Sequence, residues 1–184
     1  MSNARNLANL LGTSTTIPSG KVVSASLPTG TVLQVVQAIK TDTQSISTAT
    51  YAAITDLSAS ITPSSTNSKI LVKLSISVGN EGSNEGMHIR LYRGGSVISG
   101  ALGDASGSRD TAWIHIGPQA TTGQTSGSGM YLDSPASTSS QTYAIYARTH
   151  SASYPSYVNR SETDPDNNYH SRTTSTLTLM EIGG

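Results

Sequence analysis

The chain has 184 residues, no net formal charge, no cysteine, no phenylalanine and one tryptophan, and charged residues make up only 12% of it. The 11 basic residues are scattered among 11 acidic ones, which does not give the clustered positive charge that nucleic-acid binding needs. The lack of cysteine excludes disulfides, thiolate metal sites and a cysteine nucleophile. Since no stretch approaches the roughly 18 consecutive apolar residues of a membrane span, we expect neither nucleic-acid partners nor membrane insertion.

Residues 3–11 form the one stretch with helical spacing of apolar side chains. The stripe consists of Ala4, Leu7, Ala8 and Leu11, widened by Leu10, and Gly12 is a suitable stop. A helix this short is marginal alone in water. Its stripe therefore needs a partner, either a symmetry mate or a docking surface, and a frayed tail is the alternative.

Residues 13–30 combine two prolines and two glycines with serine and threonine, which is typical of an extended linker. This composition predicts a boundary near residue 30. We expect an anchoring segment over 1–30 and one folded domain over 31–184.

The folded part alternates in the manner of a β protein. Ile70, Val72, Leu74, Ile76 and Val78 share one face of a predicted strand, with polar side chains between them. Similar runs predict further strands at 32–40, 53–62, 87–93, 111–116, 129–132, 141–149 and 175–182. Eight short strands without intervening helices predict an all-β, antiparallel sandwich of the jelly-roll type.

Two spacers, 117–128 and 152–172, exceed ordinary connection lengths, and long loops are often functional. The second contains the candidate glycan-binding residues Tyr154, Tyr157, Asn159 and Tyr169. Aromatic faces stack on sugar rings, and amides bond to sugar hydroxyls. The alternative is that these tyrosines pack the loop onto the sandwich or onto a neighbouring subunit.

No pattern of metal-binding or catalytic residues stands out. The four histidines, at 88, 115, 150 and 170, fall in no ligand motif, although one histidine per chain meeting on a threefold axis stays open. Residues 164–168 look like the start of a calcium loop, but Tyr169 and Ser175 stand where its glycine and acid belong. No serine lies in a Gly-x-Ser-x-Gly turn. We expect no metal, no cofactor and no enzymatic activity, with a hydrolase as the remote alternative.

The thin aromatic supply leaves aliphatic side chains to fill the sandwich, which predicts modest stability for a monomer. Oligomerisation would bury more apolar area. We therefore expect a homotrimer.

Five segments together cover the start, middle and end of the chain, at residues 4–12, 17–22, 28–36, 61–72 and 177–182. These segments resemble tail-fibre and other virion proteins of marine tailed bacteriophages, including cyanophages. The resemblance implies a trimeric protein located in the virion, whose short N-terminal segment attaches to the particle and whose β domain points outward. The anchoring residues would be Leu7, Ala8, Leu10, Leu11 and Ile17.

The chain has no extended shaft, which leaves a tail, neck or head fibre and small baseplate subunits as options. The leading interpretation is a structural appendage subunit bound to other virion proteins of the tail, neck or capsid. The second interpretation is a receptor-recognition module that binds a host surface glycan through residues 154–169.

Overall fold

The computed structural model describes residues 27–80, 86–118 and 120–184. In these residues the chain forms strands, turns and one short 3-10 helix, η2 (Ser99–Ala101), and no helix is long and apolar enough to cross a membrane. The helix predicted over 3–11 lies outside the described residues.

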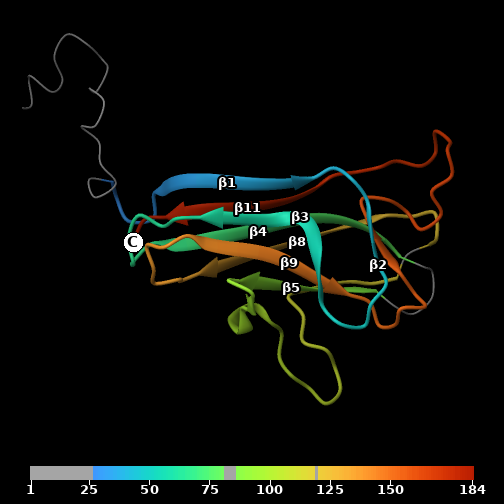
Figure 1. Ribbon diagram of the computed structural model, residues 1–184, viewed down its shortest axis with the longest axis horizontal. Helices are drawn as coiled ribbons and strands as arrows, with labels where there is room; N and C mark the ends of the chain where they lie inside the picture. Colours follow the sequence, from blue (N-terminus) through green and yellow to red (C-terminus); the bar gives the residue numbers. More distant parts are fainter. Residues whose placement is uncertain (1–26, 81–85, 119) are drawn as a thin grey trace, which may run out of the picture.

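Two antiparallel sheets pack face to face (Figure 1). The first contains β1 (Val32–Lys40), β11 (Ser175–Ile182), β4 (Lys69–Asn80) and β8 (Thr125–Asp133), with β10 (Ser156–Val158) and β2 (Gln44–Ile46) extending it. The second contains β3 (Ala52–Ile61), β9 (Gln141–Arg148), β5 (Met87–Arg93), β7 (Ile114–Ile116) and the short β6 (Ser96–Val97).

The strand order identifies the sandwich as a jelly roll. In the first sheet the order is β1-β11-β4-β8, and in the second it is β3-β9-β5-β7. Strands adjacent in each sheet come from distant parts of the chain, as in the double Greek key of this fold. The predicted fold class is confirmed.

The core lies between the sheets and is almost entirely aliphatic. Val72 and Leu74 of β4 face it fully buried, as do Ile89 and Leu91 of β5. Among the described residues, Tyr143 is the one aromatic side chain within the buried core. Burial of alternate side chains from both sheets is what the period-2 pattern predicts.

The predicted strands 32–40, 87–93 and 175–182 have the observed bounds, but the start of β8 was predicted wrongly. The strand begins at Thr125, in a Gly- and Ser-rich stretch expected to be loop. A Cβ on Gly129 would lie 2.7 Å from Ile114 Cδ1 and 3.0 Å from Trp113. Glycine is thus required because these side chains cover the strand, and it does not mark a turn here.

Candidate functional site

The chain segments at the two ends of the sandwich differ. The chain joins the sandwich at residues 27–31 beside its C-terminus, whereas residues 149–174 lie at the opposite end (Figure 1). The backbone N–H of Gly30 donates to the oxygen of Gly183 at 2.7 Å, and the N–H of Gly183 donates to Thr31 at 2.9 Å. The segment that leads to residues 1–26 is therefore fixed at the end farthest from the long loop.

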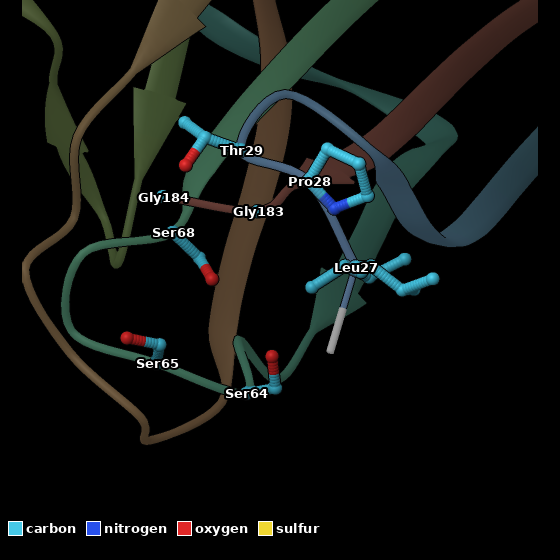
Figure 2. A pocket seen from close by; sticks show the side chains of 9 residues that line it. Leu27, Pro28, Thr29, Ser64, Ser65, Ser68, Gly183 and Gly184 are labelled. Atoms are coloured by element: carbon cyan, nitrogen blue, oxygen red, sulfur yellow. The ribbon is translucent and has the colours of Figure 1, made fainter. Parts of the chain in front are cut away.

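A hollow of about 230 Å³ lies at the end where residues 27–31 meet the C-terminus (Figure 2). It is lined by Leu27, Pro28, Thr29, Leu33, Ser64, Ser65, Ser68, Gly183 and Gly184. Nearby, the buried Glu181 carboxylate accepts hydrogen bonds from the N–H and hydroxyl of Ser64, both at 2.7 Å, and from Gln34 Nε2 at 2.6 Å. Burial acts to raise the pKa of Glu181, but these donors outweigh it and lower the pKa. The carboxylate thus holds the 62–69 turn in place.

The outer face of the β1-β11-β4-β8 sheet carries an apolar row that crosses all four strands. Strand register places Val35 opposite Met180, Met180 opposite Leu71, and Leu71 opposite Leu132. This face points away from the core, where an isolated domain would carry polar side chains.

Exposure along this face is greatest on the two outer strands. On β1, Val32, Val35 and Ile39 are 49%, 58% and 52% exposed, and on β8, Met130 and Leu132 are 66% and 46% exposed. The apolar side chains of the central strands are partly buried. Large apolar side chains gathered in this way mark an interaction surface more often than a free one.

The far end of the same face is covered by loops. Ser77 donates to Gln124 Oε1 at 3.1 Å, and Gln124 Nε2 donates to the backbone oxygen of Ser171 at 2.6 Å. The loops therefore leave the face open on the side of residues 27–31 and the C-terminus.

The long loop presents two of the four candidate glycan-binding residues to solvent. Tyr169 is 90% exposed and Tyr154 is 39% exposed. Tyr157 lies within β10, and the Arg160 guanidinium sits 3.8 Å from its ring centroid. One face of Tyr157 is thus already occupied.

Asn159 does not face solvent and is removed from the candidate glycan-binding residues. It is fully buried, with a positive φ of 63°. Its Nδ2 donates to the backbone oxygens of Lys40 at 3.0 Å and Asp42 at 2.9 Å, and its Oδ1 accepts from Ser175 Oγ at 2.6 Å. The side chain ties the loop to the sheet.

The Asp164 carboxylate of the calcium-like stretch pairs with an arginine. Asp164 Oδ2 lies 2.5 Å from Arg172 Nη2, so a guanidinium occupies the position of a cation. In the described part of the chain, no group of three or more histidine, aspartate or glutamate side chains is arranged to hold a metal ion. Residues 164–168 lie in a polar stretch of bends and turn.

A charged cluster fixes a loop on the outer face of the second sheet. Asp110 receives hydrogen bonds from Arg90 Nη2 at 2.9 Å, Arg148 Nε at 3.0 Å and the Tyr51 hydroxyl at 2.5 Å. Burial acts to raise the pKa of Asp110, but these partners outweigh it and lower the pKa, whereas burial raises the pKa of Tyr51 to about 12. The segment 98–113 is latched to the sheet through one carboxylate.

The same cluster borders a hollow of about 480 Å³ that contains a histidine pair. The rings of His88 and His115 lie 4.7 Å apart, and His88 Nδ1 is 3.2 Å from Asp110 Oδ2. Burial, together with the charges of Arg148 and His115, lowers the pKa of His88. The Asp110 carboxylate, placed between Arg90 and Arg148, holds the loop.

The anchoring residues Leu7, Ala8, Leu10, Leu11 and Ile17 lie outside the described residues. The apolar outer face, in contrast, was missed at the sequence level although a signal exists. Residues 32–39 place apolar side chains on both faces of one strand, with Val35 and Ile39 outward and Val36 and Ala38 inward. A strand that is apolar on both sides predicts burial on both sides.

No protein-family model matches the chain, and comparison with curated proteins finds no match.

Proposed function

We propose that this chain is a structural, non-catalytic subunit of a tailed-bacteriophage virion. It forms a homotrimeric fibre or appendage of the tail, neck or head. Residues 1–30 attach it to other virion proteins, and the jelly roll is displayed outward. The protein needs no cofactor or metal for this role.

The observation that carries the proposal is the apolar row on the outer face of the first sheet. Adjacent strands lie about 4.8 Å apart and rise about 3.4 Å per residue, so four strands of about eight residues present roughly 500 Å². Several large apolar side chains are exposed on this one face, and apolar side chains gathered in this way mark association sites. Association also compensates for a core that contains no phenylalanine.

The placement of residues 27–31 beside the C-terminus supports attachment at one end. Residues 27–31 join the sandwich beside Gly183, and the long loop lies at the other end. An appendage attached through residues 1–30 would hold the 149–174 loop farthest from the particle. The sequence resemblance to phage virion proteins supports the same arrangement, and jelly rolls are common in viral capsid proteins, which is an analogy at the level of the fold.

Two measurements test the proposal. Sedimentation of the full chain at micromolar concentration should give a trimer, and a monomer would contradict it. Cryo-electron microscopy of the phage particle should show three copies around one axis, with residues 1–30 against the particle. A particle that lacks the chain would remove the virion assignment.

The second candidate function is recognition of a host surface glycan, and the exposure of Tyr154 and Tyr169 favours it. The test is binding of the full chain to host surface polysaccharide, compared with Tyr169→Ala and Tyr169→Phe. Phenylalanine keeps the ring and should retain stacking, whereas alanine should lose it. Equal binding by all three proteins would exclude a role for this tyrosine.

A further inference from the structure

The exposed apolar side chains of the first sheet fall into two groups at opposite edges. The β1 flank consists of Val32, Val35 and Ile39, and the β8 flank consists of Met130 and Leu132. On the strands between them, β11 and β4, the apolar side chains of this face, Met180 and Leu71, are half-buried. Thr178 of β11 is 8% exposed and accepts a hydrogen bond of 2.9 Å from Gln37.

Two different flanks are what a closed ring of three copies requires. A patch that pairs with itself closes a dimer, whereas a ring forms when one patch meets a different patch on the next copy. Each subunit of a trimer must therefore offer two distinct surfaces, one toward each neighbour. The β1 and β8 flanks lie at opposite edges of one sheet and fulfil this condition.

We propose that the β1 flank of each copy packs against the β8 flank of the next copy. The occupant of this face is thus a second copy of the chain, joined head to tail. This inference rests on the proposed trimer and adds which surfaces meet in it.

The side chains of the two flanks suit each other. Valine and isoleucine on the β1 flank are stiff at χ1, and methionine on the β8 flank adapts its shape to irregular gaps. The rigid side chains of the β1 flank would therefore pack against a side chain of the β8 flank that can adjust to them.

Charge is depleted across the face, as at the core of protein interfaces. The three register rows that start at Val35, Gln37 and Ile39 of β1 contain one charged side chain, Lys73. In the proposed ring this face is shared between two neighbours, one at each flank. The lack of charge beside both flanks suits contact with the apolar flank of a neighbouring copy.

Cross-linking through introduced cysteines tests the contact directly, because the chain has no cysteine of its own. A Val35→Cys, Leu132→Cys double variant of the full chain, treated with a short bis-maleimide reagent, should give covalent dimers and trimers on a denaturing gel. Each single variant should give monomers. Val97 is 36% exposed on the second sheet, so a Val97→Cys, Leu132→Cys variant is the matched control and should also give monomers.

An independent double variant, Ile39→Cys with Met130→Cys, should also give covalent dimers and trimers in the same cross-linking experiment. Failure of both pairs to cross-link overturns the inference, and so does a single variant that cross-links to itself, because the flanks would then meet like with like. Sedimentation of the untreated wild-type chain separates the two proposals. A wild-type monomer overturns the proposed trimer as well, whereas a wild-type trimer with contrary cross-links overturns the head-to-tail contact alone.

Discussion

The hydroxyl of Tyr143 in β9 donates a hydrogen bond of 2.7 Å to Oδ2 of Asp133 at the end of β8, which joins the two sheets through a buried polar contact. Tyr143 is fully buried and Asp133 is 6% exposed. The Arg93 guanidinium contacts the same carboxylate oxygen. Burial and the adjacent carboxylate both raise the pKa of Tyr143, so its hydroxyl stays a donor throughout the physiological range.

Replacing Asp133 with alanine should destabilise the sandwich more than removing its tyrosine partner. Asp133→Ala leaves the Tyr143 hydroxyl without an acceptor, and an unsatisfied buried polar group costs about 1–3 kcal/mol. Tyr143→Phe removes the hydroxyl itself, so no buried donor is left without an acceptor, and Asp133 keeps its contact with Arg93. The loss of unfolding free energy should therefore be smaller. Denaturant unfolding of both variants measures the difference, with the exposed Asp166→Ala as control. A larger loss for Tyr143→Phe would contradict this account.

Replacing Asn159 with alanine should lower the stability of the fold, whereas replacing Tyr169 should not. Asn159→Ala removes three hydrogen bonds and places alanine at a positive φ, which should cost at least about 2 kcal/mol of unfolding free energy. Tyr169→Ala changes a side chain that is 90% exposed and should stay within about 0.5 kcal/mol. Thermal unfolding distinguishes them, and a stable Asn159→Ala variant would show that the loop is held by other contacts.

The main strands could be predicted because one face of each is buried, and burial on one side imposes a period of two on the sequence. β4 is the clearest case, with Val72, Leu74 and Ile76 inward. The short strands β2 and β10 were not predictable in this way. Each of them is three residues long and pairs through those three residues, and so short a run carries no period.

The candidate surfaces were predictable only in part. Tyr154 and Tyr169 are exposed, as a binding loop requires, but Asn159 is identical to a surface asparagine at the sequence level. Its burial depends on backbone oxygens at Lys40 and Asp42, more than 100 residues away in the chain. Contacts at that separation arise from the topology of the jelly roll and leave no local pattern.

Acidification should weaken the fold through His88. Burial, Arg148 and His115 lower its pKa, so the unfolded chain, with an ordinary histidine pKa of about 6.5, binds a proton before the folded chain does. Stability should therefore fall as pH drops below about 6.5. Unfolding at pH 7.5 and pH 5 should show a smaller loss for His88→Gln than for the wild type. An NMR titration that places the pKa of His88 above that of an unfolded peptide would reverse the sign.

The ionised Asp110 carboxylate should hold residues 98–113 on the sheet until the pH falls well below the range in which His88 titrates. Its partners Arg90, Arg148 and Tyr51 lower its pKa against the effect of burial. The stabilisation is thus present above the ordinary aspartate pKa of about 3.9 and is lost as pH falls through the lowered value. Asp110→Asn should speed hydrogen exchange of residues 98–113 at pH 7 and flatten the acid dependence. Unchanged exchange in this variant would mean that other contacts latch the segment.

Met130 should matter for assembly and not for the folding of the single chain. Its side chain is 66% exposed, so Met130→Glu should change the unfolding free energy of the monomer by no more than about 0.5 kcal/mol. In the proposed trimer the same carboxylate would be buried against a neighbouring apolar flank without a partner, which costs several kcal/mol. Sedimentation should therefore show dissociation of Met130→Glu, whereas Val97→Glu on the second sheet keeps the trimer. Leu179→Ala, which empties a fully buried core position, should instead lower unfolding stability by about 2–5 kcal/mol. A trimer that tolerates Met130→Glu would place its contacts outside this face.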